Sequence, residues 1–227
     1  EAWLPTRHGD EVMLCTMPLF HVSAVAMCLH LSVFAAGELL IHRRFDARAA
    51  LDALADDGVT LMSAAPAIFH DLLLQHDLAR VAQGRLRACY SGAAPLPTRT
   101  LAAFERITGC PIHEGYGQSE GGPCLTYNPM HLPRKPGSVG LPVPGGELRL
   151  LDPQGEDVPR GGVGEICVRG PHVMAGYRNR PDLTAQALRA GWLHTGDLAR
   201  QDEDGYVFIQ GRLHDAINVG GFKVYPL

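Results

Sequence analysis

Lysine is scarce in this 227-residue sequence, and no basic cluster is present. Lys135 and Lys223 are the only lysines, and the formal net charge at pH 7 is −4. We therefore do not expect nucleic acid or an anionic membrane surface to be the main partner. Hydrophobic residues make up 46% of the chain, which is enough to form the core of a globular protein.

Paired-cysteine motifs are also missing. The six cysteines form no C-x-x-C pair and no zinc-type spacing with histidine, and they are Cys15, Cys28, Cys89, Cys110, Cys124 and Cys167. Several lie in apolar segments, where a buried free thiol is the simpler interpretation. We expect reduced thiols and a cytoplasmic protein.

Long apolar runs and targeting signals are absent as well. The first residues, EAWLPTRHGDE, resemble neither a signal peptide nor a transit peptide. The longest apolar run extends from Val22 to Gly37 and is interrupted by His30 and Ser32. It is too short to cross a bilayer, so we expect no transmembrane segment.

The first half of the chain alternates between strand and helix patterns. Strands are predicted over residues 12–17, 39–42, 59–63, 87–90 and 111–114, and helices over residues 22–36, 46–55, 66–74 and 97–107. Asp46 is placed to cap the second helix, and Gly109 to end the fourth. This alternation predicts the α/β class, with a mostly parallel sheet flanked by helices.

A different pattern follows Gly121. Proline, glycine and aspartate separate short strands, which are predicted over residues 147–151, 165–169, 197–201 and 206–210. We expect a small antiparallel, barrel-like β subdomain that begins near residue 143. Trp192, Tyr177 and Met174 are expected to be packing residues.

The segment GYGQSEGGP, residues 115–123, supports two different hypotheses. Gly117 to Gly121 fits G-x-S-x-G, the nucleophile elbow of serine hydrolases, and Asp197 and His214 would complete the chain order of a triad. An elbow needs a helix that starts at the serine, but prolines follow here at positions 123, 129, 133 and 136. The context therefore argues against the hydrolase.

The second hypothesis is a nucleotide-binding loop. It follows a predicted parallel strand, and open α/β sheets bind ligands at the carboxyl ends of their strands. Tyr116 could stack on a base, the Ser119 hydroxyl could donate to a phosphate oxygen, and the Glu120 carboxylate could hold Mg²⁺. Taken alone, an ordinary glycine-rich turn explains the loop equally well.

Several further motifs occur in order along the chain. They are PLFH at residues 18–21, SGAAPL at 91–96, YGQSE at 116–120, GWLHTGD at 191–197, DGY at 204–206, GR at 211–212, GG at 220–221 and VYP at 224–226. Together they resemble the adenylate-forming superfamily, and within it the acyl-CoA synthetases, over nearly the full chain. Ser119 stands where that family usually has threonine, a change that keeps the hydroxyl.

The resemblance implies ATP-dependent activation of a carboxylic acid. The carboxylate would attack the α-phosphate of ATP, pyrophosphate would leave, and the acyl-adenylate would acylate the thiol of coenzyme A. The implied substrates and cofactors are the acid, ATP, Mg²⁺ and coenzyme A. Because the helix after His21 is apolar, a fatty or aryl acid is favoured.

Motif positions then imply roles for individual residues. The nucleotide-binding residues would be Gly92, Ala93, Ala94, Pro95, Tyr116, Gly117, Asp197 and Arg212. The catalytic residues would be Ser119 at the α-phosphate, Glu120 as the Mg²⁺ ligand, and His21. The acyl pocket would be bordered by His21, Val22 and Gly140, and the interdomain hinge would be His214.

The resemblance also implies parts that this chain does not contain. The family's phosphate loop should precede residue 18, and a C-terminal domain with the adenylation lysine should follow residue 226, so Lys223 is not that lysine. We expect residues 1–142 to be the distal α/β part of a large adenylation domain, 143–211 its β subdomain, and 212–227 the hinge and the start of the C-terminal domain. Alone, the chain is expected to be inactive or nearly so.

Three alternatives stay open at this stage. The acyl group could be delivered to a carrier protein instead of coenzyme A. The chain could be a non-catalytic nucleotide-binding module, although the intact Tyr116, Glu120, Asp197 and Arg212 speak against a decayed site. A homodimer is retained as an alternative assembly.

Overall fold

The computed structural model describes residues 6–213, 217–219 and 222–224, the last two segments as backbone only. The chain forms two compact units. The first comprises Glu1–Tyr116 and Asn128–Gly137, and the second comprises Gly117–Tyr127 and Ser138–Leu227. The domain boundaries expected from the sequence stay a prediction.

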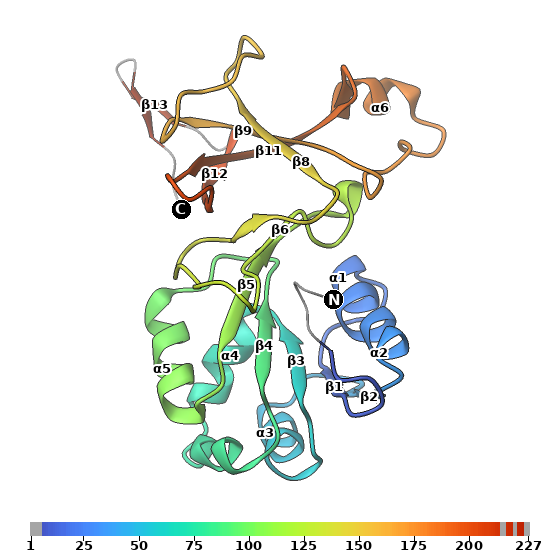
Figure 1. The fold of residues 1–227 in the computed structure, drawn as a ribbon, viewed down its shortest axis with the longest axis vertical. Helices are drawn as coiled ribbons and strands as arrows, with labels where there is room; N and C mark the ends of the chain where they lie inside the picture. Colours follow the sequence, from blue (N-terminus) through green and yellow to red (C-terminus); the bar gives the residue numbers. More distant parts are fainter. Residues whose placement is uncertain (1–5, 214–216, 220–221, 225–227) are drawn as a thin grey trace. The chain divides into compact units, whose positions relative to one another are not determined.

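The first unit is built on parallel strands (Figure 1). In spatial order they are β2 (Glu38–Ile41), β1 (Val12–Cys15), β3 (Leu61–Ala64), β4 (Ala88–Ser91) and β5 (Ile112–Tyr116). Every neighbouring pair among these five is parallel. Strands β3 and β4 are buried along their whole length, as expected for parallel strands covered on both faces. The predicted α/β class is confirmed.

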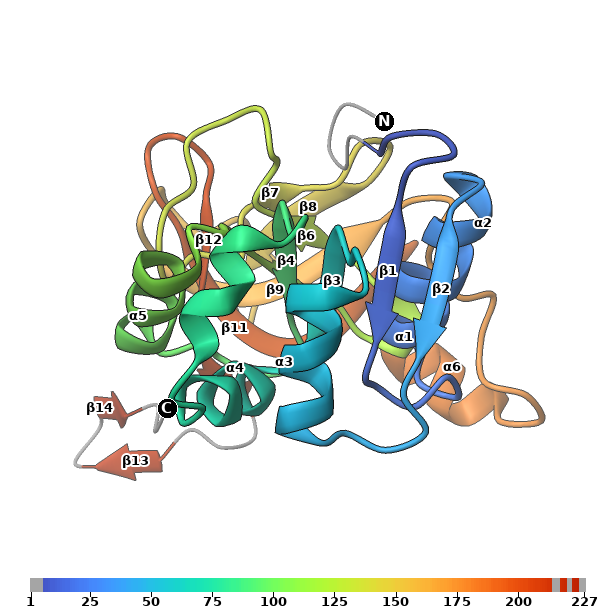
Figure 2. The ribbon, with the colours of Figure 1, turned by 90° about the horizontal axis from the view of Figure 1, so that it is seen from below.

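Figure 2 shows α3 (Ala47–Asp56), α4 (Pro66–Leu73) and α5 (Thr98–Thr108) together on one side of these strands. The Asp46 side chain caps α3, because its Oδ1 accepts a hydrogen bond from the backbone N–H of Ala49 at 2.8 Å. Gly109 ends α5 with φ of 70°. Both sequence-predicted caps are confirmed. A 3-10 helix, η2 (Leu78–Gln83), was not predicted.

The apolar segment after His21 is helical but not uniform. It consists of α1 (Val22–Ala24), the π-helix η1 (Val25–His30) and α2 (Leu31–Phe34). We predicted one helix to Ala36, but Ala36 has φ of 48° and leaves the helix. Gly37 then passes so close to the first strand that a Cβ would lie 2.4 Å from the Glu11 carbonyl oxygen.

The second unit is antiparallel, which confirms the predicted β subdomain. Its main sheet contains β8 (Glu147–Leu151), β9 (Val163–Arg169), β10 (Leu188–Arg189), β11 (Trp192–Gln201) and β12 (Val207–Arg212). Strand β11 pairs with β9, β10 and β12, and its register with β9 shifts between His194 and Leu198. The smaller elements are η3 (Ser119–Gly121), β6 (Thr126–Tyr127), β7 (Leu141–Pro142), α6 (Pro181–Ala187), β13 (Ile217–Val219) and β14 (Phe222–Val224).

Helices of membrane-spanning length and hydropathy do not occur among the described residues.

Candidate nucleotide and acyl site

The predicted adenine segment lies beside Tyr116 in the first unit. Strands β4 and β5 are parallel neighbours, and Ser91 pairs in register with Glu114. The loop that begins at Gly92 and the end of β5 therefore leave the sheet at the same edge. A Cβ on Gly92 would lie 3.4 Å from the carbonyl oxygen of Gly115, so this loop and β5 are in close contact.

The loop itself, which continues through Ala93, Ala94 and Pro95, is exposed and conformationally unusual. Ala93 has φ of 69°, a left-handed conformation that is uncommon for a residue with a side chain. Such conformations persist only where the surrounding structure holds them, and residues that adopt them cluster at active sites and ligand-binding sites. Exposed backbone at the carboxyl edge of a parallel sheet is a geometry that receives ligands.

His21 follows β1, which leaves the sheet at the same edge two strands away from β4. Its Nδ1 accepts a hydrogen bond from the backbone N–H of Ser23 at 3.2 Å, so the side chain caps the helix. The imidazole is exposed, and Val22, the first helical residue, is half-buried. Both residues therefore lie at the start of the helical segment that contains the π-helix. Turns of this type are frequent at functional sites.

Glu114 is a buried carboxyl that the sequence analysis missed. It lies in β5 two residues before Tyr116, and only 7% of the residue is exposed. Burial raises the pKa of Glu114 to about 7, although its Oε2 accepts a hydrogen bond from the backbone N–H of Gly137 at 3.2 Å. A glutamate inside a short strand pattern carries no sequence signal of this burial.

Ser119 and Glu120 belong to the second unit and form the short turn η3. The carboxylate of Glu120 accepts a hydrogen bond through Oε1 from the hydroxyl of Tyr177 at 2.8 Å. This bond is the main reason that the pKa of Tyr177 is raised. We expected Tyr177 to be a packing residue, but its ring is exposed and its hydroxyl orients Glu120. The backbone is tied as well, since Met174 N–H donates to the Glu120 carbonyl at 2.8 Å.

Glycines shape this turn. A Cβ on Gly117 would lie 2.4 Å from the carbonyl oxygen of Pro123, so the loop could not close with any other residue there. Ser119 is exposed and starts a turn that ends at Gly121. A nucleophile elbow would place a longer helix at this serine. The geometry therefore favours a ligand-binding loop over the hydrolase hypothesis.

Asp197 and Arg212 are brought together across β11 and β12, where they are register partners. Arg212 Nε lies 3.4 Å from Asp197 Oδ1, with the aspartate side chain 13% exposed and the arginine 74% exposed. Gly140, in the same unit, is buried with φ of 88° and bridges to Val207. His214, the predicted hinge, lies outside the described residues.

The chain is similar in sequence and structure to proteins of a known family. The family described as "AMP-binding enzyme" matches residues 1–178. A long-chain-fatty-acid–CoA ligase of Salmonella typhimurium is 37% identical over 224 residues, which cover 98% of this chain and 40% of the relative. A feruloyl-CoA synthase of Amycolatopsis is 38% identical over 219 residues, covering 96% of this chain and 44% of the relative.

Among solved structures, ATP-bound MatB from Rhodopseudomonas palustris superposes with a TM-score of 0.90. It is 35% identical, and the match covers 96% of this chain and 43% of that one. The chain thus spans 40% and 44% of the lengths of the two curated relatives above.

Proposed function

Because this chain belongs to the AMP-binding enzyme family, we propose that the full-length protein activates a carboxylic acid with ATP and transfers the acyl group to coenzyme A. The observation that carries the proposal is the exposed loop after β4 beside Tyr116, at the carboxyl edge of a parallel sheet. That edge is where open α/β folds bind nucleotides.

In the first unit, Gly92 to Pro95 and Tyr116 would hold the adenine. The open backbone of the loop can approach the base closely, and the tyrosine ring offers a stacking surface. His21 and Val22, at the start of the helical segment, would border the acyl chain. Their position at the same edge of the sheet supports these roles.

In the second unit, Asp197 would accept hydrogen bonds from the ribose hydroxyls, since a carboxylate is a pure acceptor. Arg212 lies beside it and would offer N–H donors to the ribose or to a phosphate. The exposed Ser119 hydroxyl would donate to an α-phosphate oxygen, and Gly117 would let the backbone approach the nucleotide. Gly140 would border the acyl pocket.

Glu120 fits the proposed Mg²⁺ ligand. One carboxylate oxygen is held by Tyr177, and within the described part of the chain the other, Oε2, has no hydrogen-bond partner. An oriented carboxylate oxygen is the kind of donor that Mg²⁺ prefers. When bound, Mg²⁺ would neutralise charge on the phosphates of ATP.

The reaction would run in two steps, formation of the acyl-adenylate and transfer of the acyl group to coenzyme A. The substrate carboxylate attacks the α-phosphorus, the bond to the bridging oxygen of the β-phosphate breaks, and pyrophosphate leaves. The thiol of coenzyme A then attacks the acyl carbonyl, loses its proton, and AMP leaves. The residues above would orient the reactants and stabilise phosphate charge, which is the main protein contribution to such chemistry.

The acid is proposed to be fatty or aryl. The helical segment that begins at Val22 is rich in apolar residues, which suits an apolar chain better than a charged one. Two relatives named for a long-chain fatty acid and for a feruloyl group support this class.

Pyrophosphate release by the full-length protein, with Mg-ATP and a panel of acids, tests the proposal. We expect acid-dependent release that coenzyme A accelerates, and a loss of about a hundredfold in kcat in Glu120→Gln. Glu203→Gln, which changes an exposed glutamate in a turn of the same unit, is the matched control and should stay within about twofold of the wild type. Release without dependence on any acid, or ester hydrolysis that is lost in Ser119→Ala, would contradict the proposal.

A further inference from the structure

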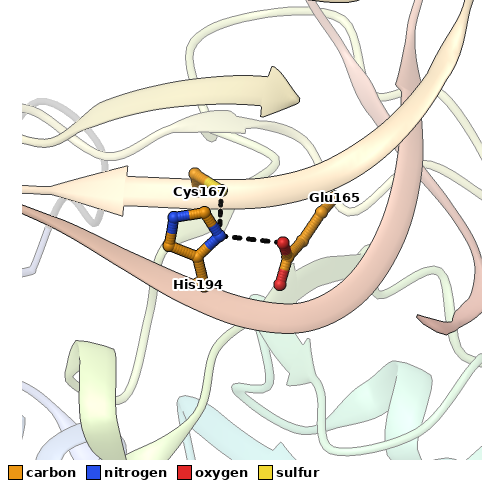
Figure 3. Close-up of side chains that lie close together, drawn as sticks. All are labelled: Glu165, Cys167 and His194. Atoms are coloured by element: carbon orange, nitrogen blue, oxygen red, sulfur yellow. Dashed lines mark hydrogen bonds and ion pairs between the residues drawn. The ribbon is translucent and has the colours of Figure 1, made fainter. Parts of the chain in front are cut away.

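Three side chains of different chemistry meet between β9 and β11 in the second unit (Figure 3). Cys167 and His194 are register partners across the two strands. Glu165 lies two residues before Cys167 and therefore projects from the same face of β9. The register shift of β11 after His194 brings Glu165 next to the imidazole as well.

The ligand atoms converge on one place. His194 Nδ1 lies 3.3 Å from Cys167 Sγ and 2.8 Å from Glu165 Oε2. Each of the three residues offers one ligand atom, and these ligand atoms lie within 4.8 Å of one another. Figure 3 shows both contacts reaching the same ring nitrogen. A nucleophile–base–carboxylate relay uses the two different nitrogens of the imidazole, so this trio does not have the geometry of a catalytic triad.

We propose that Glu165, Cys167 and His194 form a binding site for a zinc-type divalent cation. One thiolate, one imidazole and one carboxylate are a borderline-soft donor set that suits Zn²⁺, whereas Mg²⁺ and Ca²⁺ select sites made of oxygen. Tetrahedral coordination at ordinary zinc–ligand distances separates the donor atoms by about 3.3–3.6 Å. The sulfur–nitrogen pair already has this spacing, and the nitrogen–oxygen pair would open by about 0.5 Å.

The surroundings complete the site. Gly196 N–H donates to the other carboxylate oxygen of Glu165 at 3.0 Å, which orients Oε2 toward the imidazole. A cavity of about 470 Å³, lined by Glu165 and His194, opens beside the trio and gives a path for the ion and room for a water at the fourth position. Arg189 also lies 3.4 Å from Oε2, but its side chain is 54% exposed and can move into solvent when a cation binds.

The bound ion would clamp β9 to β11 next to the register shift. Cys167 is buried, and both Glu165 and His194 are only 13% exposed, so the ion would replace hydrogen bonds that already hold the strands. Zinc binding releases the thiol proton and adds its free energy to folding. This inference is independent of the proposed acyl activation.

Zinc titration of the full-length protein, stripped of metal with a chelator, tests the site. Calorimetry should give one zinc bound through these residues with a dissociation constant in or below the micromolar range, and a higher melting temperature. Cobalt should produce a thiolate-to-metal charge-transfer band. Magnesium at the same concentration should give neither the calorimetric binding signal nor the rise in melting temperature.

Cys167→Ser and His194→Ala should weaken this binding by about a hundredfold or more, and Cys167→Ser should abolish the cobalt band. Cys124→Ser, in the same unit, and His70→Ala, exposed on α4, are matched controls that should keep both signals. Glu165→Gln provides a third ligand loss with conserved shape, which decides the matter if Cys167→Ser does not fold. The proposal would be overturned if the wild type bound no zinc. It would also be overturned if Glu165→Gln and His194→Ala bound zinc as tightly as the wild type.

Discussion

At the scale of single residues, the hydroxyl of Tyr177 sets the orientation of the carboxylate proposed to bind Mg²⁺. Tyr177→Phe removes only this donor. A hydrogen bond to a charged group contributes more than a neutral one, but the partial exposure of the ring limits its contribution here. We therefore expect the Mg²⁺ concentration for half-maximal pyrophosphate release to rise about two- to tenfold. The exposed neighbour Arg178→Ala is the control. Identical Mg²⁺ dependence in both variants would show that Tyr177 does not position Glu120.

Glu114 makes stability depend on pH. Its pKa is raised from 4.5 to about 7 because burial disfavours the carboxylate. Between pH 4.5 and about 7 the folded state therefore keeps a proton that the unfolded state has already lost. Stability falls as pH rises across this range, and the loss is complete once Glu114 ionises in the folded state at about 7.

Glu114→Gln replaces the titratable carboxyl with an amide that does not ionise, and the amide oxygen can still accept the hydrogen bond from Gly137 N–H. We expect the variant to exceed the wild type in free energy of unfolding by roughly 2–3 kcal/mol at about pH 8, and by much less at about pH 5. Urea unfolding at the two pH values measures this. Glu203→Gln should show no such trend, and a difference for Glu114→Gln that stays constant with pH would refute the assignment.

At the scale of elements, helix α3 depends on its first cap. Asp46→Ala leaves the N–H of Ala49 without its side-chain acceptor, which should cost about 1 kcal/mol of stability. Asp57→Ala, at the other end of the same helix, removes a negative charge from the end where the helix dipole disfavours it. It should be neutral or slightly stabilising, within about 0.5 kcal/mol. Equal losses in both variants, by thermal or urea unfolding, would contradict the capping argument.

The helical segment from Val22 to Phe34 shows where element-level prediction stops. Its apolar composition indicates a buried helix, and the segment is helical. The π-turn from Val25 to His30 has no such signal, because the same residues could form i→i+4 hydrogen bonds. Packing against β1 and β3, with the sharp exit at Gly37, accompanies the wider turn.

At the scale of the whole molecule, the core of the first unit contains the aromatic pair Phe69 and Phe104. Their rings are 5.2 Å apart in an edge-to-face arrangement, and both side chains are fully buried. Phe104→Ala should lower the free energy of unfolding by about 3–5 kcal/mol, because it loses the buried surface and leaves a cavity. Leu74→Ala, at an exposed position that ends α4, should cost less than about 0.5 kcal/mol. Comparable losses in both would show that the pair is not central to the core.

Local patterns in the sequence were enough to predict the order and type of the main elements. Asp46 and Gly109 act on backbone groups within a few residues, so their capping roles can be read without a structure. Strand β8, predicted over 147–151, has those bounds in the structure. The motifs around Tyr116 and Asp197 likewise indicate the family from the sequence alone.

Tertiary structure alone decided the contacts between distant residues. Tyr177 donates to Glu120 across 57 positions of sequence, and Glu165 meets His194 because β11 shifts register beside it. Strand register, bulges and burial depend on the packing of the complete chain, and a shift of one residue changes which side chains share a face. The sequence by itself therefore determined the elements and the family, and the fold decided which carboxylates are oriented, buried or gathered beside a thiol.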